Sequence, residues 1–542
     1  MIRPRHFKAA QENSGRMNVV ADPAHAPAGP NGTRLPTARS VIYDPTPAEL
    51  QELTSRMPQA RRTVFGNYNV QTRVVSRSKG STYLVTDDPA ITNDQTISRA
   101  EGARVAAIQD AFIADREMVV VDGFIGNDPE YRSRARLYIE VANANIAGMQ
   151  QQLFFPPDRL AGEWVPELVI IYTPNLSMPD YPDHRLIAVD LETGITRVMN
   201  SDYFGESKKG GLRMWNAKVY VAGGLAMHAG CKVVPTDAGE RTILIIGLSG
   251  TGKTTTTFTR QNGSQPVQDD FIGLFPGGKV VGTENGCFAK TFGLDPRHEP
   301  AIHGAVTMPD AYLENVSQKV VNGPVDFFDI GYTRNGRATF PMASLGIWRD
   351  PRHIGPVNAL LILNRNDNVI PGVARLSREQ AAAYFMLGET QGTSAGGAAE
   401  EGRALRVPGT NPFYPYRDEQ QANRFWELMG THPFDVYLVN TGRVGGPEDD
   451  PRSKKLEIEH SGAIVKAIAE ESIHWERDPD FEYQVAIEVP GIEDPELLRP
   501  GLLYERTGRA DEYRRWVERL KQERAEFLAG FPGLRPEILA AV

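Results

Sequence analysis

The apolar residues of this chain fall mainly in short continuous runs, which polar or glycine-rich segments separate. Runs of this length predict buried strands, because a strand covered on both faces needs apolar side chains at successive positions. They lie at residues 83–85, 118–121, 168–171, 242–246, 358–363 and 436–439.

Helices are predicted between and after these strands. Residues 46–49 read Thr-Pro-Ala-Glu, which combines a capping threonine, proline at the first helical position and glutamate three residues after the cap. A helical stretch is predicted at 97–115, and residues 511–528 repeat apolar side chains at helical spacing. Together the two kinds of element predict an α/β fold.

The length of the chain and two segments of biased composition predict its organisation. The 542 residues suffice for two to four domains, or for two large lobes that share a cleft. Residues 1–42 are rich in Ala, Pro, Gly and Asn without periodicity, so we expect a disordered tail there. Residues 388–411 are dense in Gly, Ala, Thr and Glu and predict a mobile loop.

Composition and charge narrow the class of protein. With 41% hydrophobic and 23% charged residues, the chain is typical of folded globular proteins. The net charge of −9 disfavours binding to nucleic acid or to an anionic membrane. No apolar run reaches the roughly 18–20 residues of a membrane span. The two cysteines, Cys231 and Cys287, fit a reducing compartment, so we expect a cytoplasmic protein. Basic residues within positions 1–16 leave an organelle-targeting segment as the alternative.

A phosphate-binding pattern follows the predicted strand at 242–246. Residues 247–254 read Gly-Leu-Ser-Gly-Thr-Gly-Lys-Thr and match G-x-x-x-x-G-K-[ST], in which glycines let backbone N–H groups turn towards an anion at the start of a helix. We expect Lys253 to reach the β- and γ-phosphates of a nucleotide and the Thr254 hydroxyl to bind Mg²⁺. Downstream, the adjacent carboxylates of Asp269 and Asp270 are the kind of acid that holds the metal in phosphate-loop enzymes.

Two lysines and a histidine form a second candidate group. Lys208 and Lys209 stand beside glycines, and His228 lies among small and apolar residues. One interpretation is a solvated basic turn and a core histidine. In the other, the lysines lie close together beside a metal, which lowers the pKa of one ammonium until the neutral amine can act as a ligand. His228 and Asp270 then complete a mixed nitrogen and oxygen site suited to Mn²⁺ or Mg²⁺.

The order of several sequence blocks resembles that of the signature blocks of ATP-dependent phosphoenolpyruvate carboxykinases. The resemblance covers about residues 60–490, and Arg77 and Arg337 lie where the family keeps a carboxylate-binding loop and a phosphate-facing arginine. The phosphate loop is similar to that of the ATP-using class rather than the GTP-using class. The blocks are residues 203–210, 227–228, 247–255, 269–270, 284–290, 313–316 and 439–442.

The resemblance implies a two-lobed α/β fold with the active site in the cleft between the lobes. Residues 43–235 are the expected N-terminal substrate-binding lobe, and residues 236–542 are the expected C-terminal lobe, which contains the phosphate loop and binds a mononucleotide. The implied reaction is reversible and gluconeogenic: oxaloacetate and ATP yield phosphoenolpyruvate, CO₂ and ADP. A monomer or small homo-oligomer with small-molecule substrates, and with neither nucleic acid nor membrane as a partner, is expected.

The resemblance also implies roles for individual residues. Arg77 grips a substrate carboxylate, Tyr203 borders the pocket, and Lys208 and Lys209 add positive potential. The implied ligands are Lys209, His228 and Asp270 for Mn²⁺ and Thr254 for Mg²⁺. The implied catalytic residues are Lys208, Lys209, His228, Ser249, Lys253, Asp270 and Arg337. The implied nucleotide-binding residues are Gly247, Leu248, Ser249, Gly250, Thr251, Gly252, Lys253, Thr254, Thr255, Asp269, Lys290, Glu314, Arg337 and Lys455.

Some positions depart from the usual pattern of the family. The loop at 75–80 reads Val-Ser-Arg-Ser-Lys-Gly, Phe271 stands where acidic residues are usual, Lys455 replaces an expected arginine, and residues 392–415 match poorly. These departures leave two alternatives. One is a divergent kinase on the same scaffold that phosphorylates another small acid or a protein hydroxyl. The other is a protein that binds ATP without turnover.

Overall fold

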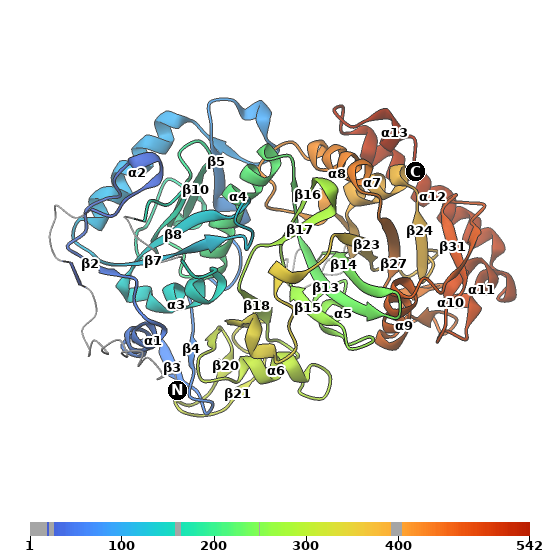
Figure 1. The fold of residues 1–542 in the computed structure, drawn as a ribbon, viewed down its shortest axis with the longest axis horizontal. Coiled ribbons are helices and arrows are strands. Elements are labelled where there is room, and N and C mark those ends of the chain that lie inside the picture. Colours follow the sequence, from blue (N-terminus) through green and yellow to red (C-terminus); the bar gives the residue numbers. More distant parts are fainter. Residues whose placement is uncertain (1–18, 21–25, 158–163, 249, 392–403) are drawn as a thin grey trace, which may run out of the picture.

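The computed structural model describes residues 19–20, 26–157, 164–248, 250–391 and 404–542 (Figure 1). It is a mixed α/β structure with two large mixed sheets and several smaller ones, which confirms the predicted α/β class. The predicted apolar runs all fall within strands, and residues 511–528 fall within a helix. The stretch predicted as helical at 97–115 is a helix at Arg99–Ile113 only, because Ile97 ends a short strand and Ser98 caps the helix.

The first large sheet is built from the N-terminal part of the chain. Its strands are β1 (Val19–Val20), β2 (Ser40–Tyr43), β5 (Thr82–Val85), β6 (Thr96–Ile97), β7 (Glu117–Ile125), β8 (Ser133–Glu140), β9 (Leu168–Thr173), β10 (Leu186–Asp190) and β11 (Ile195–Met199). They lie in the order β1-β2-β7-β8-β9-β11-β10-β5-β6. The central strands β7, β8 and β9 are buried along nearly their whole length, and the apolar runs at 118–121 and 168–171 predict this burial for β7 and β9.

The second large sheet is built from the C-terminal part. Its strands are β13 (Ala229–Thr236), β14 (Gly239–Ile246), β15 (Gln265–Gln268), β23 (Val357–Asn364), β24 (Val373–Leu376), β27 (Asp435–Asn440), β30 (His474–Arg477) and β31 (Gln484–Glu488). They lie in the order β15-β13-β14-β23-β27-β24-β31-β30. The three apolar runs β14, β23 and β27 pair in parallel at its centre, and the phosphate loop follows β14.

Smaller sheets connect segments that are far apart in the sequence. A three-stranded sheet contains β12 (Leu225–Met227), β16 (Ile272–Phe275) and β17 (Lys279–Gly282). A five-stranded sheet contains β3 (Ala60–Arg62), β4 (Tyr68–Val70), β18 (Gly286–Lys290), β19 (Tyr312–Glu314) and β22 (Arg337–Pro341). The two-stranded pairs are β20 (Ser317–Gln318) with β21 (Val325–Asp326), β25 (Glu389–Gln391) with β26 (Ala404–Arg406), and β28 (Arg443–Val444) with β29 (Lys454–Lys455).

Helices cover the faces of both large sheets (Figure 1). The first of them begins at the predicted capping box, in which Thr46 and Glu49 bond each other's backbone N–H groups. The helices are α1 (Pro47–Ser55), α2 (Arg99–Ile113), α3 (Ala144–Leu153), α4 (Gly205–Val221), α5 (Lys253–Phe258), α6 (Pro300–Val306), α7 (Arg378–Leu387), α8 (Glu419–Thr431), α9 (Ile458–Ala469), α10 (Pro495–Leu498), α11 (Pro500–Arg506), α12 (Ala510–Ala529) and α13 (Pro536–Leu539).

Residues 26–42 differ from the disordered tail expected for residues 1–42. β2 pairs in parallel with β7, and Leu35 and Ala38 are buried. The buried guanidinium of Arg136 also donates a hydrogen bond to the carbonyl of Ala28 at 2.7 Å. The edge of the large sheet orders this segment, and composition alone carries no signal for such a contact. Residues 1–18 and 21–25 lie outside the described residues.

The five-stranded sheet crosses the expected boundary at residue 235. Its strand β4 pairs in parallel with β19, so Tyr68 lies opposite Tyr312. The N-terminal segment 60–70 therefore folds with residues 286–341. A division of the chain at residue 235 would separate strands of one sheet.

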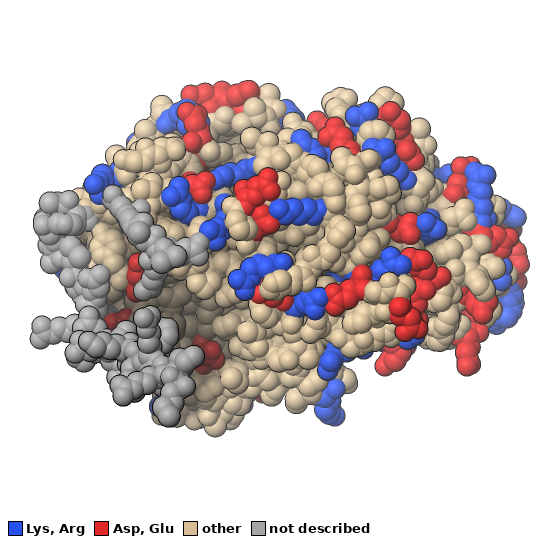
Figure 2. Space-filling view, viewed as in Figure 1, with Lys and Arg blue, Asp and Glu red and all other residues tan. Residues whose placement is uncertain are grey.

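The charge distribution on the surface and the length of the helices concern binding to nucleic acid and to membranes. On the face shown in Figure 2, basic and acidic side chains are interspersed. Within the described parts of the chain, no helix is long and apolar enough to cross a membrane.

Candidate active site

Helix α4 carries the two adjacent lysines and packs closely on the nine-stranded sheet. A Cβ atom added at Gly210 would lie 2.9 Å from the side chain of Thr196 in β11, so glycine is needed for the helix to approach the strand. Lys208 and Lys209 lie just before this glycine in the first turns of α4. The side chain of Lys208 is fully buried, and that of Lys209 is only 13% exposed. The predicted lysine pair is therefore an interior feature, and the solvated-turn interpretation is wrong.

The carboxylate of Asp270 is the centre of a cluster of nitrogen-containing side chains. The Nζ atoms of Lys208 and Lys209 each lie 2.9 Å from its Oδ2 atom. The Nε2 atom of His228 lies 2.7 Å from its Oδ1 atom, and the Nζ atom of Lys253 lies 3.2 Å from the same oxygen. Burial alone would raise the pKa of Asp270, but these neighbours hold it well below its usual value. Asp270 is therefore an anion that holds three separate segments together.

The two lysines differ in their proton affinity. Burial and the charge of Lys208 outweigh the attraction of Asp270 and lower the pKa of Lys209 to about 8. Burial also disfavours the positive charge of Lys208. The carboxylates of Asp270 and Glu284 outweigh this effect and raise the pKa of Lys208. The carboxylate of Glu284 lies 2.6 Å from the Nζ atom of Lys208. At neutral pH, Lys208 thus keeps its proton. Lys209 releases its proton more readily than an ordinary lysine, because its pKa lies only about one unit above neutral.

His228 is held as a neutral imidazole between two oxygen acceptors. Burial and the charge of Lys253 lower its pKa to about 4. Its Nδ1 atom lies 2.9 Å from the carbonyl oxygen of Thr410, and its Nε2 atom faces Asp270. A neutral imidazole carries one N–H hydrogen, so it can donate to only one of these acceptors. With the hydrogen on Nδ1, a lone pair on Nε2 faces the carboxylate of Asp270.

This donor set fits a divalent cation. Imidazole nitrogen, amine nitrogen and carboxylate oxygen form a mixed N/O set that suits Mn²⁺. The described residues contain no group of three or more His, Cys, Asp and Glu side chains that could hold a metal. The three metal ligands expected from the sequence, Lys209, His228 and Asp270, lie in direct contact around the carboxylate of Asp270.

The phosphate loop between β14 and α5 has the backbone that its glycines predict. Gly250 and Gly252 have φ values of +89° and +88°, which residues other than glycine rarely adopt. The hydroxyl of Thr441, at the end of β27, donates to the carbonyl of Thr251 at 2.8 Å and ties the loop to the second large sheet. The rest of the predicted loop, Gly247, Leu248, Thr254 and Thr255, lies in the same turn and in α5, and Ser249 lies outside the described residues.

Asp269 lies beside the phosphate loop with free hydrogen-bonding capacity. Burial raises its pKa, while Lys253 and a hydrogen bond with the Thr254 side chain oppose that shift. Its Oδ1 atom is buried without a hydrogen-bond partner among the described residues. Such an atom is rare in folded proteins. It is available to a water or ligand bound to Thr254.

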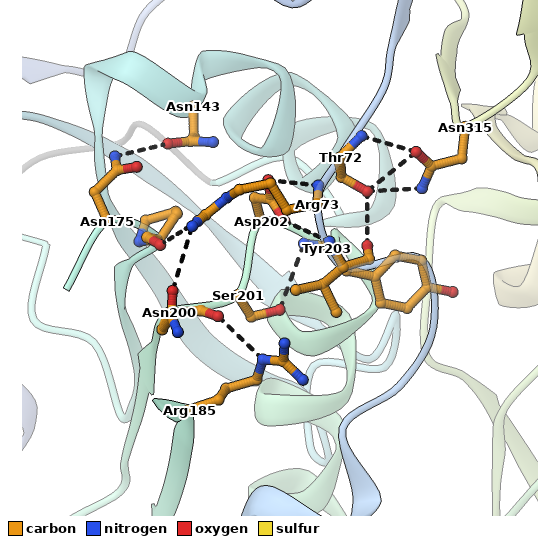
Figure 3. Close-up of polar contacts among 12 residues, drawn as sticks. Thr72, Arg73, Asn143, Asn175, Arg185, Asn200, Ser201, Asp202, Tyr203 and Asn315 are labelled. Atoms are coloured by element: carbon orange, nitrogen blue, oxygen red, sulfur yellow. Dashed lines mark hydrogen bonds and ion pairs between the residues drawn. The ribbon is translucent and has the colours of Figure 1, made fainter. Parts of the chain in front are cut away.

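The loop that carries Arg77 is fixed against the segment before α4 (Figure 3). The carboxylate of Asp202 accepts hydrogen bonds from the backbone N–H groups of Arg73 and Val74 at 2.9 and 3.0 Å. In the same loop, the backbone N–H of Ser78 donates to Glu206 in the first turn of α4 at 2.6 Å. These bonds place Arg77 next to α4.

Arg77 and Tyr203 border this region in different ways. Arg77 is half-buried and makes no hydrogen bond or ion pair with any residue that the structure describes. Tyr203 is buried, and its hydroxyl accepts a hydrogen bond from the side chain of Asn335 at 3.3 Å. Asn335 also donates to the carbonyl of Val75 at 2.7 Å. The loop of Arg77, Tyr203 and the strand of Arg337 thus share one hydrogen-bond network.

The remaining predicted residues divide between the site and the surface. Arg337 bonds Asn335 through its Nε atom at 3.1 Å, and its guanidinium stacks over Phe288, whose ring also faces Lys208. Lys290 and Glu314 lie beside Arg337 in neighbouring strands. The side chain of Lys455 is 56% exposed, and its ammonium pairs with Glu457 at 2.8 Å.

Because the carboxyl group of Glu314 is buried, we expect the stability of the protein to depend on pH. Burial raises its pKa to about 8, whereas an exposed glutamate titrates near 4.5. The folded state therefore holds a proton that the unfolded chain releases, so the stability contribution of Glu314 is lost as pH rises from about 4.5 to 8. We expect Glu314→Gln to raise the melting temperature relative to wild type by several degrees at pH 8 and by little at pH 5. An exposed control, Glu518→Gln, should give a constant difference, and a constant difference for Glu314→Gln would contradict the burial argument.

Several residues of the cluster were not predicted from the sequence. Glu284 pairs with Lys208, Thr410 bonds His228, and the ring of Phe413 lies 4.4 Å from the Nζ atom of Lys209. Glu284 opens a matched block, which is a signal that could have identified it. Thr410 and Phe413 carry no motif, because they act through a backbone carbonyl and an aromatic face.

The segment predicted as a mobile loop is a wall of the site in its described part. Thr410 contacts His228, and Asn411 donates to the carbonyl of Ala226 at 3.2 Å. At the other end, Arg524 pairs with Glu389 at 2.9 Å. These contacts come from distant segments, so the local composition could not predict them. Residues 392–403 lie outside the described residues.

Comparisons with known proteins agree with this arrangement. Residues 39–495 match the family described as phosphoenolpyruvate carboxykinase. The chain is also similar to proteins from several organisms that are named phosphoenolpyruvate carboxykinase (ATP). The protein from Moorella thermoacetica is 30% identical over 89% of this chain and 93% of its own length. The protein from Methylorubrum extorquens is 31% identical over 71% of this chain and 72% of its own length. The protein from Thermus thermophilus is 30% identical over 79% of this chain and 82% of its own length.

Proposed function

The chain belongs to the ATP-dependent phosphoenolpyruvate carboxykinase family, and from that premise we propose that it converts oxaloacetate and ATP to phosphoenolpyruvate, CO₂ and ADP at the cluster around Asp270. The observation that carries the proposal is the shared carboxylate of Asp270. It joins Lys253 of the phosphate loop to Lys208 and Lys209 of α4, which lie on the side of Arg77 and Tyr203. A nucleotide and a small acid bound on the two sides would meet there.

The two large sheets support a two-lobed arrangement around this site. We propose that the nine-stranded sheet is the core of the substrate-binding lobe and the eight-stranded sheet the core of the nucleotide-binding lobe, broadly residues 43–235 and 236–542. The five-stranded sheet joins the two parts, since it pairs β4 with β19. The loop at 247–254 would bind the phosphates of ATP through its inward-facing backbone N–H groups and Lys253.

Two divalent cations fit the donors of the site. Lys209, His228 and Asp270 would hold Mn²⁺, and Thr254 with Asp269 would hold Mg²⁺ together with the nucleotide. Such cations supply Lewis-acid stabilisation for an enolate oxygen and for the phosphates. The buried, low-pKa environment of His228 suits this role, because a neutral imidazole is the form that binds metals.

The residues of α4 and its neighbours account for the decarboxylation step. Arg77 would bind a carboxylate of oxaloacetate through a guanidinium fork. The carbon–carbon bond to the leaving carboxylate breaks, CO₂ departs, and the electron pair becomes an enolate. Lys208 would place a positive charge beside this anion. Because its pKa is raised, Lys208 retains its proton and does not convert the enolate to pyruvate.

Phosphoryl transfer would follow by in-line attack of the enolate oxygen on the γ-phosphorus of ATP. The bond from that phosphorus to the bridging oxygen breaks, ADP leaves, and the net reaction transfers no proton. Lys253 and Arg337 would neutralise charge on the phosphoryl group. The apolar faces of Phe288 and Phe413 beside the lysines would limit the access of water.

The role of Arg77 can be tested by steady-state kinetics. We expect Arg77→Met to raise the KM for oxaloacetate about 10- to 100-fold and to leave the KM for ATP nearly unchanged, because one charged hydrogen-bonding group is lost on the acid side only. Arg352→Met is a matched control, since Arg352 pairs with Asp350 on the surface at 2.5 Å. The opposite pattern of KM values would place the loop of Arg77 on the nucleotide side.

The proposed reaction can be tested directly with purified protein. Phosphoenolpyruvate formation would be measured with oxaloacetate, ATP, Mg²⁺ and Mn²⁺, with GTP and pyrophosphate in place of ATP as controls. We expect product with ATP and little with either replacement. ATP binding without product from oxaloacetate would refute the proposed reaction and favour a kinase with a different acceptor.

A further inference from the structure

Arg213 is a buried arginine without a hydrogen-bond or ion-pair partner among the residues that the structure describes. It lies in α4, one turn after Lys209, and its side chain is only 7% exposed. Its guanidinium makes no hydrogen bond or ion pair with any described residue, and its Nη1 atom is fully buried. An unpaired buried charge is strongly unfavourable, so such a group normally has a counter-ion or a ligand.

The other buried arginines of the described chain differ from Arg213 in this respect. Arg136 pairs with Asp122 at 2.7 Å, and Arg524 pairs with Glu389 at 2.9 Å. Arg509 donates to the carbonyl of Gly445 at 2.7 Å. The fold therefore supplies an acceptor for a buried guanidinium wherever the charge is structural, and at Arg213 it supplies none.

The position of Arg213 on α4 directs it towards the acid-binding side of the site. Glu206, Lys209 and Arg213 are spaced by three and four residues, so they share one face of the helix. Glu206 on that face bonds the backbone of Ser78, which adjoins Arg77. Lys209 on the same face lies beside Asp270. Arg213 therefore lies on the face that meets both the Arg77 loop and the proposed metal ligands.

The charges around Arg213 favour an incoming anion. Burial and the nearby charge of Arg77 disfavour its positive charge, whereas the charges of Glu206 and Asp94 favour it. One oxygen of Glu206 is already engaged by Ser78. The guanidinium is packed over Phe413 at 5.3 Å from the ring centroid, the ring that Lys209 also faces. Two neighbouring arginines, neither with an ion-pair partner in the described part of the chain, form a site for a carboxylate.

We propose that Arg213 is a substrate-binding residue that, together with Arg77, binds a carboxylate of a dicarboxylic 2-oxo acid. This inference rests on the proposed function, because that reaction supplies the acid. Two guanidiniums attract a dianion more strongly than a monoanion, so Arg213 makes the site select dicarboxylates over monocarboxylates such as pyruvate.

The first test measures anion binding without turnover. Melting curves of wild type, Arg213→Met and Arg213→Lys would be recorded with and without malonate as the dicarboxylate, and with acetate as the monocarboxylate. We expect malonate to raise the melting temperature of wild type more than acetate does, and this rise to disappear in Arg213→Met and to be partly kept in Arg213→Lys. Without ligand, Arg213→Met should melt at the wild-type temperature or above it, because an unpaired buried charge has been removed.

The second test separates substrate binding from a structural role by kinetics. We expect Arg213→Met to raise the KM for oxaloacetate about 10- to 100-fold, with a smaller change in kcat and no change in the KM for ATP. Lys218→Met is the matched control on the same helix, since Lys218 pairs with Glu167 at 2.5 Å outside the site. The double variant Arg77→Met/Arg213→Met should show less than the sum of the two single effects, because both residues bind one carboxylate.

The outcomes distinguish this inference from the proposed function. If wild type forms phosphoenolpyruvate and Arg213→Met keeps its KM for oxaloacetate, the inference is wrong and the proposed function stands. A lower melting temperature of ligand-free Arg213→Met, with malonate stabilisation unchanged, would likewise make Arg213 structural. If wild type forms no phosphoenolpyruvate, the proposed function fails. Malonate stabilisation that depends on Arg213 would then still support the carboxylate site, and its absence would refute that site.

Discussion

The Asp270→Asn variant is expected to lose at least about a thousandfold in kcat/KM for phosphoenolpyruvate formation. The carboxylate of Asp270 is the shared counter-charge of Lys208, Lys209 and Lys253 and faces the Nε2 atom of His228. A neutral amide of the same shape keeps the packing but leaves like charges without their partner. It also removes the anionic donor of the proposed Mn²⁺ site, so Mn²⁺ affinity measured by calorimetry should fall in parallel.

Two comparisons make this result interpretable. Asp435→Asn removes a carboxylate that pairs with Arg375 at 2.6 Å on the surface, and it should leave kcat/KM near the wild-type value. Circular dichroism of Asp270→Asn would establish that the variant is folded. A folded variant that retains a tenth or more of wild-type activity would contradict the central role of Asp270.

The Lys253→Met variant is expected to lower kcat about a thousandfold or more with ATP as the phosphoryl donor. The ammonium of Lys253 in the predicted phosphate loop also reaches Asp270, at 3.2 Å. Its charge would act on the transferring phosphoryl group, where negative charge moves during the reaction. Single-turnover measurements with oxaloacetate and ATP would separate this chemical step from product release.

The control for this variant is the substitution of an exposed lysine. Lys466→Met removes an ammonium that pairs with Glu470 on α9 at 2.6 Å, and we expect no effect on kcat. The double variant Asp270→Asn/Lys253→Met should lose less than the product of the two single effects, because the residues are in contact. Phosphoryl transfer at the wild-type rate in Lys253→Met would refute the assignment of residues 247–254 to ATP.

The candidate site could be predicted from the sequence where its chemistry is local. The residues from Gly250 to Lys253 are adjacent in the chain, and their backbone conformation follows from glycine at positions of positive φ. Lys208 and Lys209 are neighbours in one helix. Lys253 was predicted from the phosphate-binding pattern, and His228 and Asp270 were predicted in one of two interpretations of the residues. The structure brings the three together around one carboxylate. Their roles in catalysis remain proposals with the tests given above.

Other residues of the site could not be predicted, because nothing local marks them. Thr410 contributes a backbone carbonyl, which every residue has, and Phe413 contributes an aromatic face in a segment that was expected to be mobile. Arg213 looks like an ordinary polar position of an amphipathic helix until its burial and its missing partner are known. The role of Lys455 in nucleotide binding stays a prediction, since its side chain is exposed and pairs with Glu457.

The sequence by itself determined the elements of this protein: the buried strands, the helices that alternate with them, the phosphate loop and the lysine pair. Each follows from the side chains of neighbouring residues, and local sterics and periodicity act within such short segments. The tertiary structure decided which distant segments meet. It paired β4 with β19 across the expected boundary, ordered residues 26–42 on the sheet edge and buried Arg213 beside Arg77. Those outcomes depend on the total surface that the whole chain buries, so no single segment contains them.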